Sequence, residues 1–231
     1  MQINGLQKLT LLDFPGKIAC TVFLGGCNFR CPFCHNASLA LAERVKSNTI
    51  ISNEEFFDFL KKRVGILQGV CISGGEPTLY HDLPSFIKEI RKMGFSVKLD
   101  TNGYNPTMLE QIINDGIVDY IAMDIKNSKE KYALTTGIPN LDVSRIEKSA
   151  ALLMAGKMDF EFRTTVVKEL HDEEDIEKIG RWLCGNENYF LQTFKDSGDL
   201  IESGFSGYDE KHTNYLLNLL LKYVPNAQIR G

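Results

Sequence analysis

Short apolar runs alternate with amphipathic stretches along nearly the whole chain, and this order of elements restricts the possible folds most. An apolar run of about four to eight residues predicts a buried strand, whereas apolar residues at helical spacing predict a helix. Strands that alternate with helices favour a parallel sheet with right-handed crossovers. The expected strands are 18–24, 70–73, 96–100, 120–125, 160–167 and 189–194.

The expected helices lie between these strands and have recognisable ends. Ser52-Asn53-Glu54-Glu55 has the pattern of a capping box, so a helix should begin there. Gly94 and Gly156 follow two other amphipathic stretches, where glycine is typical of a helix C-terminus. The other expected helices are 82–93, 106–114, 144–155, 172–183 and 209–223.

Six strand–helix units are too few for a closed (β/α)8 barrel, which typically takes about 250 residues. The 231 residues fit a curved, partly open α/β barrel with a parallel sheet better, a partial (β/α)6 TIM-like barrel. No long linker, repeat or low-complexity segment interrupts the pattern, so we expect one domain over residues 1–231. Ligands of such sheets bind at the carboxyl ends of the strands.

Composition and charge exclude some partners. A net charge of −4 and scattered basic residues argue against nucleic acid. No apolar run approaches the roughly 18 residues that a membrane helix needs, and residues 1–16 lack the features of a signal peptide. These observations predict a cytoplasmic protein without a membrane partner, in a compartment where thiols stay reduced.

Three cysteines with the spacing Cys-x3-Cys-x2-Cys follow the first expected strand: Cys27, Cys31 and Cys34. Thiolates hold iron–sulfur clusters, and ordinary electron-transfer clusters take four of them. No fourth cysteine lies nearby, so a cubic four-iron cluster on this loop would keep one iron open for a substrate. A Cys3His zinc site with His35 is the alternative, but His35 directly follows Cys34, and adjacent residues rarely both reach one metal.

The other thiols and imidazoles suggest no second site. Three dispersed cysteines are expected to be small buried apolar side chains: Cys20, Cys71 and Cys184. Three histidines in loops or at helix starts are expected at the surface: His81, His171 and His212.

Unusual polar residues follow the later strands. Gly-Gly-Glu-Pro at 74–77 follows the second strand, Asp100 ends the third, and Asp124 ends the fourth. Two carboxylates at adjacent strand ends repel each other unless a cation or a donor lies between them. Arg163, in the fifth strand, needs an anionic partner, which either Asp124 or a ligand carboxylate would provide.

The cysteine loop, followed about forty residues later by Gly-Gly-Glu-Pro, resembles the radical S-adenosylmethionine (SAM) superfamily. The resemblance implies a partial barrel and one 4Fe–4S cluster on Cys27, Cys31 and Cys34, whose open iron binds SAM and whose electron splits it. The residues that the resemblance assigns to the SAM site are Phe33, His35, Gly74, Gly75, Glu76, Asp100, Thr101, Asn102, Asp124, Lys126, Arg163 and Gln192.

Asp-Thr-Asn-Gly followed by Asp-x-Lys resembles the glycyl-radical-enzyme activases. This branch implies a monovalent cation near Asp100 and Asp124, beside the SAM carboxylate. It also implies a glycyl radical enzyme as protein substrate, from which a glycine hydrogen is abstracted, and a flavodoxin or ferredoxin-type reductant. Residues 10–17 resemble the start of the activating proteins of anaerobic ribonucleoside-triphosphate reductase.

Three alternatives stay open from the sequence. The partner could be a pyruvate formate-lyase-like enzyme, or the chain could act on a small molecule, as a deazaguanine synthase does. A non-enzymatic zinc or iron–sulfur module is the third. The sixth strand also departs from the best-known activase, because Gln192 stands in a strand where that enzyme has a SAM-contacting histidine.

Overall fold

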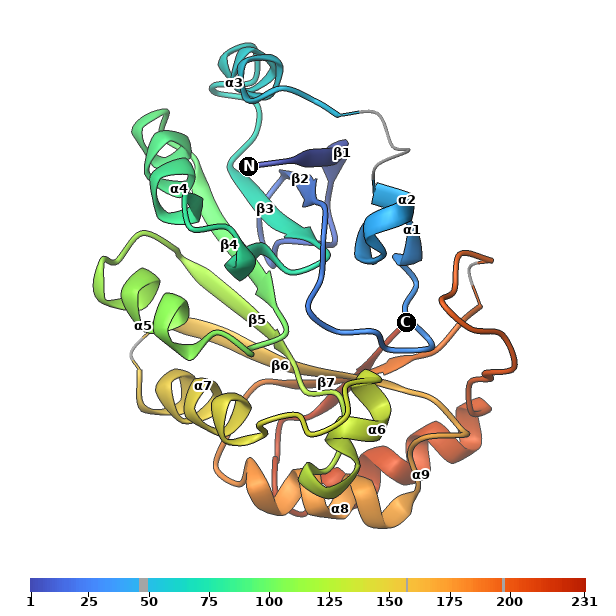
Figure 1. Cartoon of the computed structure of the whole chain (residues 1–231). Coiled ribbons are helices and arrows are strands. Elements are labelled where there is room, and N and C mark those ends of the chain that lie inside the picture. Colours follow the sequence, from blue (N-terminus) through green and yellow to red (C-terminus); the bar gives the residue numbers. More distant parts are fainter. Residues whose placement is uncertain (46–49, 157, 197) are drawn as a thin grey trace.

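The computed structural model describes residues 1–45, 50–156, 158–196 and 198–231. Within these residues, eight strands form one sheet in the order in which they follow along the chain (Figure 1). β1 pairs with β2 antiparallel, and each later pair of neighbours is parallel. The strands are β1 (Ile3–Thr10), β2 (Ala19–Leu24), β3 (Gly69–Gly74), β4 (Ser96–Thr101), β5 (Tyr120–Asp124), β6 (Asp159–Val166), β7 (Tyr189–Thr193) and β8 (Gln228–Arg230).

The predicted α/β partial barrel is confirmed. Strands β2 to β7 are the six predicted strands, and their ends lie within one residue of the expected ones. The sheet is curved, and β1 and β8 are its two outer strands (Figure 1). These two outer strands were not predicted; they widen a six-stranded parallel barrel wall to eight strands.

The larger helices lie on the outer side of the curved sheet (Figure 1). The capping box at Ser52 and Glu55 is confirmed at the start of α3, and α5 and α7 have the predicted bounds. The helices are α1 (Ala37–Ala40), α2 (Ala42–Val45), α3 (Asn53–Lys61), α4 (Leu83–Lys92), α5 (Pro106–Asn114), α6 (Tyr132–Thr136), α7 (Ser144–Ala155), α8 (Glu173–Trp182) and α9 (Glu210–Leu220), with 3-10 turns at Pro77–Leu79 and Lys129–Lys131. No helix in the described ranges is both long enough and apolar enough to cross a membrane.

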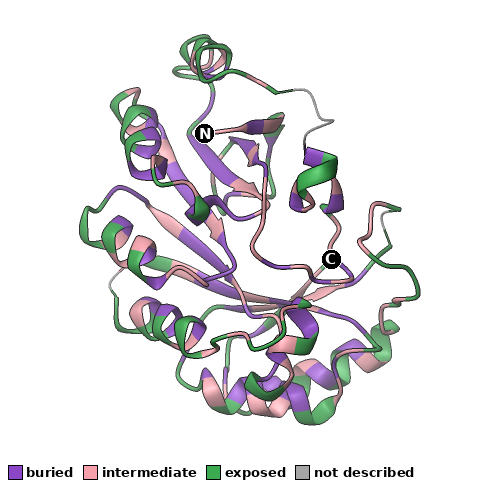
Figure 2. Cartoon of the chain, viewed as in Figure 1, coloured by how far each residue is buried: buried purple, intermediate pink, exposed green. Residues whose placement is uncertain are grey.

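The two faces of the sheet differ in chemistry because successive side chains of a strand point to opposite sides. Figure 2 shows buried residues along the strands and on the helices, with exposed residues mainly on the helices and loops. Val97 and Leu99 of β4 are fully buried in the apolar core. Lys98 and Asp100 alternate with them and pair with each other. The inner face of the barrel therefore carries charged groups at the level where the strands end.

Candidate active site

The cysteine loop leaves β2 at its carboxyl end and is fixed by backbone and side-chain hydrogen bonds. The guanidinium of Arg30 donates to the carbonyl oxygens of Cys27 at 2.6 Å and Phe29 at 2.7 Å. The backbone nitrogen of Arg30 donates to the carbonyl of Thr136 at 2.8 Å, which ties the loop to α6. Arg30 thus anchors the loop through contacts that involve none of the thiols.

The three thiols of this loop face a shared cavity, but they do not form a single-ion site. In the described part of the chain, no three His, Cys, Asp or Glu side chains are placed to hold one metal ion. Burial raises the pKa of Cys27 to about 11 and that of Cys31 to about 12. A structural zinc ion needs four ligands at about 2.0–2.3 Å, and the described residues bring no such set together here.

One cavity of about 270 Å³ lies at the carboxyl ends of the parallel strands. The three cysteines line it together with eleven of the twelve residues predicted for the SAM site: Phe33, His35, Gly74, Gly75, Asp100, Thr101, Asn102, Asp124, Lys126, Arg163 and Gln192. Five further residues in the lining were not predicted: Phe29, Asn36, Ala40, Ser73 and Thr165. The topology thus brings together segments that span most of the chain.

Gly74 and Gly75 bring the loop after β3 against the backbone of the cysteine loop. A Cβ on Gly75 would lie 2.0 Å from the carbonyl oxygen of Gly26, and one on Gly74 would lie 2.3 Å from the carbonyl oxygen of Leu24. Gly74 also has a φ of +122°, a backbone conformation that favours glycine. The sequence predicts two glycines that approach a ligand, whereas the close approach that requires them is to the chain's own backbone.

Glu76 is the one predicted SAM residue that does not line the cavity. Its carboxylate is 1% exposed and accepts hydrogen bonds from the backbone nitrogens of Asn102 at 2.6 Å and Thr78 at 3.0 Å. The hydroxyl of Thr101 donates to it at 2.8 Å. Glu76 therefore joins the loop after β3 to the loop after β4, and we assign it a positioning role instead of direct ligand contact.

Asn102 extends this connection to the cysteine loop. Its side-chain amide donates to the side-chain oxygen Oδ1 of Asn28 at 2.8 Å and lies 3.9 Å from the Cys27 sulfur. The backbone nitrogen of Phe29 also points at that sulfur, at 3.4 Å. The loop after β4 thus supplies a polar contact at one of the three thiols.

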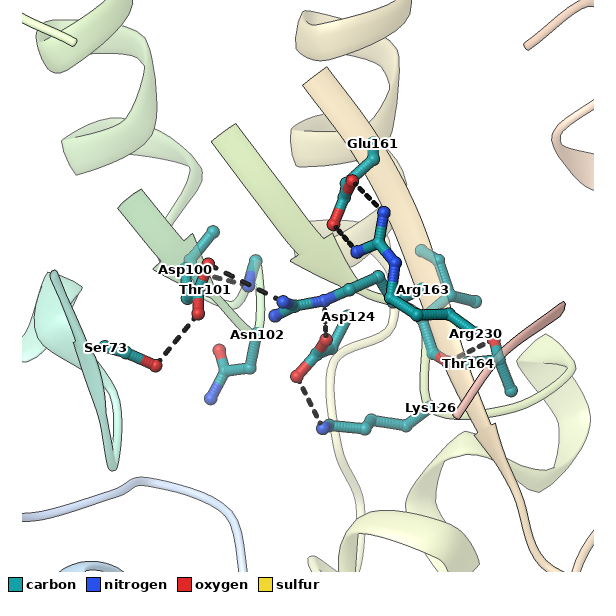
Figure 3. A network of polar contacts seen from close by, with 12 residues as sticks. Ser73, Asp100, Thr101, Asn102, Asp124, Lys126, Glu161, Arg163, Thr164 and Arg230 are labelled. Carbon is teal, nitrogen blue, oxygen red and sulfur yellow. Dashed lines mark hydrogen bonds and ion pairs between the residues drawn. The ribbon is translucent and has the colours of Figure 1, made fainter. Parts of the chain in front are cut away.

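Asp100 and Asp124 lie at the ends of β4 and β5, and the guanidinium of Arg163 lies between them (Figure 3). Its Nε donates to Asp124 Oδ1 at 2.9 Å, and one terminal nitrogen lies 3.6 Å from Asp100 Oδ1. Lys126 Nζ donates to Asp124 Oδ2 at 3.0 Å. Of the two partners that the sequence leaves open for Arg163, the structure pairs it with Asp124.

Asp100 has two more partners on the inner face of the barrel. Lys98, two residues earlier on β4, pairs with its Oδ1. The hydroxyl of Ser73 donates to its Oδ2 at 2.9 Å. Of the cation or donor that the repulsion between Asp100 and Asp124 calls for, the structure therefore provides side chains of the protein itself.

The charges of this cluster are stabilised by one another. Burial alone would raise the pKa of Asp124, but Arg163 and Lys126 outweigh it and lower this pKa to about 2. Burial would also raise the pKa of Asp100, yet Arg163 and Lys98 hold it below its usual range. For Lys98, burial favours the neutral form, but Asp100 and Cys71 keep its pKa above the ordinary value. All five groups of this cluster are charged at neutral pH.

The rings of Phe33 and His35 form an aromatic part of the cavity lining and pack against further aromatic rings. Phe33 is buried, and its ring lies 6.4 Å from that of Phe194 and 6.5 Å from that of Phe205. The His35 ring lies 5.0 Å from the Phe194 ring, and burial followed by the nearby Lys126 charge lowers the pKa of His35. This part of the lining offers a neutral, apolar surface to a planar ligand group.

Two of the lesser predictions are wrong. His171 is buried, not at the surface: its Nε2 lies 2.7 Å from the carbonyl oxygen of Lys126, and its Nδ1 lies 3.1 Å from the backbone nitrogen of Val167. Cys184 is exposed, because Leu183 takes the buried position past the end of α8. The predictions for the other side chains stand as follows: Cys20 and Cys71 are buried, His81 is exposed, and His212 is half-buried.

The sequence analysis did not include Lys98 and Ser73 among the site residues, although their positions in the predicted strands indicate that they lie there. Lys98 precedes Asp100 by two residues in a strand, so alternation places both on one face. Ser73 ends the strand that neighbours β4, where strand ends meet. Both residues could therefore have been placed on the inner face, near Asp100, from the predicted strands and their alternation.

Comparison with known proteins shows which sequence family the chain resembles. Residues 21–183 match the sequence profile of the radical SAM superfamily. A protein of Methanocaldococcus jannaschii named as a glycyl-radical enzyme activating enzyme is 33% identical over 237 residues, covering 99% of this chain and 95% of the relative. The pyruvate formate-lyase-activating enzyme of Clostridium pasteurianum is 30% identical over 141 residues, covering 59% of this chain and 57% of the relative.

The fold also has a counterpart among solved structures. Streptococcus suis SuiB bound to its precursor peptide SuiA superposes with a TM-score of 0.70 at 16% sequence identity. The superposition covers 91% of this chain and 48% of that one. At this level of identity the likeness concerns the fold alone.

Proposed function

Because the chain belongs to the radical SAM superfamily, in its branch of glycyl-radical enzyme activating enzymes, we propose that it activates anaerobic ribonucleoside-triphosphate reductase. In this proposal Cys27, Cys31 and Cys34 hold a 4Fe–4S cluster, and SAM binds in the cavity beside it. The observation that carries the proposal is the meeting of the three thiols with eleven predicted SAM residues in one cavity. When bound, cluster and SAM together supply the one-electron chemistry that removes a glycine hydrogen atom.

The donor set of the cysteine loop suits an iron–sulfur cluster. Soft thiolates select iron–sulfur clusters among metal centres, and the loop provides three of them, with no fourth cysteine among the described residues that line the cavity. Contacts to cluster sulfurs tune such centres. The Phe29 backbone nitrogen and the Asn102 amide already point at the Cys27 sulfur. The chain thus provides both the ligands and a polar environment for them.

The charged side of the cavity suits the amino-acid part of SAM. Arg163 and Lys126 bring positive charge to the lining, where an anionic carboxylate would find donors. Phe33 and the ring of His35 form the apolar side, which suits a stacked or edge-on adenine. Gln192 also lines the cavity, and we propose that its amide contributes a hydrogen bond there.

The proposed partner is a protein, since the reacting atom is a backbone glycine of another enzyme. β1 and β8 are the outer strands of the sheet and do not pair with each other within the described residues, so the barrel wall stays open on one side for a partner's loop. The choice of the reductase rests on residues 10–17, which resemble the start of its activating proteins. A flavodoxin or ferredoxin-type protein would supply the electron, in the cytoplasm.

The cluster assignment is tested by metal analysis of protein reconstituted without oxygen. We expect about four iron and four sulfide ions per chain in the wild type. Cys31→Ala should lose them, whereas Cys184→Ala should keep them, because the Cys184 thiol is exposed and distant in sequence from the loop. One zinc without sulfide in the wild type, or iron retained in the Cys31 variant, would overturn the assignment.

The partner is tested by electron paramagnetic resonance. The reconstituted protein is incubated anaerobically with dithionite, SAM and either the reductase or pyruvate formate-lyase. A glycyl doublet with the reductase alone is the expected result. A doublet with the lyase alone would show that the partner is wrong, and deoxyadenosine without a doublet from either would remove the activase proposal.

A further inference from the structure

Each of the four carboxylate oxygens of Asp100 and Asp124 has a hydrogen-bond or ionic partner in the chain. Asp124 Oδ1 faces Arg163 Nε at 2.9 Å, and its Oδ2 faces Lys126 Nζ at 3.0 Å. Asp100 Oδ1 is paired with Lys98, and its Oδ2 accepts from the hydroxyl of Ser73 at 2.9 Å. Three of the four oxygens therefore have a cationic partner from the chain itself.

A monovalent metal ion does not fit this arrangement. Such an ion would have to take oxygen ligands from Asp100 and Asp124 and would then lie beside the guanidinium of Arg163, which already spans the two carboxylates. The metal ion and the guanidinium are both positive and would repel each other, more strongly in a partly buried site than in water. The cation expected from the family resemblance and the side chains present here thus exclude each other.

Lys98 is the unusual member of the cluster. Its side chain is only 2% exposed, and its Nζ lies 3.9 Å from the Cys71 sulfur, with Asp100 as its ionic partner. Buried ammonium groups are costly unless they are paired. Lys98 therefore places a buried positive charge next to Asp100, the carboxylate that also faces Arg163.

The charge count of the cluster leaves one positive charge over. Lys98, Arg163 and Lys126 contribute three positive charges against two negative ones from Asp100 and Asp124, so the sum is +1.

A neighbouring acid, Glu161, does not change this sum because it has a cation of its own. Its carboxylate accepts two hydrogen bonds from the guanidinium of Arg230, at 2.7 and 3.0 Å. The hydroxyl of Tyr120 also donates to it, at 2.9 Å. Glu161 is therefore neutralised by Arg230 and is not counted among the five groups of the cluster.

We propose that Lys98, together with Arg163, takes the place of a solvent monovalent cation in this protein. Lys98 is then a positioning residue, which holds Asp100 and Arg163 in place for the carboxylate of SAM, and ligand binding is independent of sodium and potassium. The inference rests on the proposed function to the extent that SAM is the ligand.

The test measures SAM binding to the reconstituted protein by anaerobic equilibrium dialysis, in choline, lithium, sodium and potassium chloride at equal ionic strength. For the wild type we expect dissociation constants that agree within about twofold across the four salts. A wild type that binds at least about tenfold more weakly in choline than in potassium or sodium would overturn the proposal.

Substitution of Lys98 gives the second arm. Lys98→Met keeps the length of the side chain and removes the charge, and we expect SAM binding to weaken about tenfold in choline and to recover with potassium or sodium. Lys98→Arg should stay independent of the salt. Lys92→Met is the matched control, since Lys92 is an exposed lysine paired with Glu89 on α4, and it should behave as the wild type.

The outcomes separate this inference from the proposed function. If the Met variant binds SAM as the wild type does in every salt, Lys98 has no positioning role and the inference is wrong. If the Met variant does not fold, the salt series of the wild type and of Lys98→Arg still decides. If the wild type binds no SAM in any salt, the proposed function fails, and this inference fails with it.

Discussion

The buried carboxylate of Glu76 offers a direct test of how the cavity is assembled, by the substitution Glu76→Gln. Burial raises the pKa of Glu76, although the hydrogen bonds of its neighbours oppose the shift. Oε2 accepts from the Asn102 backbone nitrogen at 2.6 Å, and Oε1 accepts from the Thr78 backbone nitrogen at 3.0 Å. A glutamine side chain has only one oxygen, so its NH2 group must face one of these two N–H donors.

The expected loss of stability follows from that conflict. A buried donor without an acceptor costs about 1–3 kcal/mol, whichever way the new amide group is turned. Removing a buried negative charge returns part of this cost, because burial had disfavoured the ionised form. We therefore expect Glu76→Gln to lower the free energy of unfolding by about 1–2 kcal/mol.

Urea unfolding of the reduced protein at pH 7 measures this value. Glu89→Gln is the matched control: Glu89 is an exposed residue paired with Lys92 on α4, and its substitution should change stability by less than about 0.5 kcal/mol. The hydroxyl of Thr101 donates to Glu76, so Thr101→Val combined with Glu76→Gln should be non-additive by at least about 0.5 kcal/mol. A Glu76 variant as stable as the control, or additivity in the double variant, would refute the assigned role.

The other predictions concern backbone contact, pH and thiol access. Gly75→Ala should destabilise by about 1–3 kcal/mol in urea unfolding, because its Cβ would lie 2.0 Å from the Gly26 carbonyl oxygen; wild-type stability would contradict that approach. The pKa of Asp124 is lowered to about 2, so its contribution, about 2 kcal/mol, is present above the unfolded pKa and lost as pH falls from about 4 toward 2. The urea midpoint of the wild type should fall toward that of Asp124→Asn over this range, and a constant difference would refute it. Cys184 is exposed and Cys71 is buried, so a maleimide should label Cys184 in the native protein and Cys71 only after unfolding, as peptide mass mapping would detect.

The inner strands could be predicted from the sequence because each contains a short β-branched or apolar stretch, continuous in β2 and alternating with charged residues in β4. The outer strands could not. β1 (Ile3–Thr10) has three consecutive exposed residues in its second half, and its identity depends on the antiparallel partner β2. β8 has three residues, too few to show any periodicity, and exists as a strand because β7 offers it a parallel edge.

The members of the site could be predicted from the family resemblance, and their meeting in one place follows because parallel strands bring their carboxyl ends together. What each member contacts could not, since contacts depend on distances that spacing does not give. Glu76 and Asp100 both follow strands, yet Glu76 turns into the protein while Asp100 lines the cavity. His171 was missed for a similar reason: a histidine before a helix is usually solvated, but here the ring is buried, edge-on to the Phe33 ring at 6.5 Å.

The short strand β8 contributes a cation, Arg230, to the charged residues on the inner face of the sheet. Glu161 of β6 is completely buried and lies two residues before Arg163, on the same face of the strand. Without a cation of its own, Glu161 would compete with Asp124 for that guanidinium. Arg230 of β8 removes the competition by two hydrogen bonds to Glu161, at 2.7 and 3.0 Å. The last strand of the sheet thereby leaves Arg163 to Asp100 and Asp124, so the charge balance of the cavity is set by an element at the opposite end of the sheet from the cysteine loop.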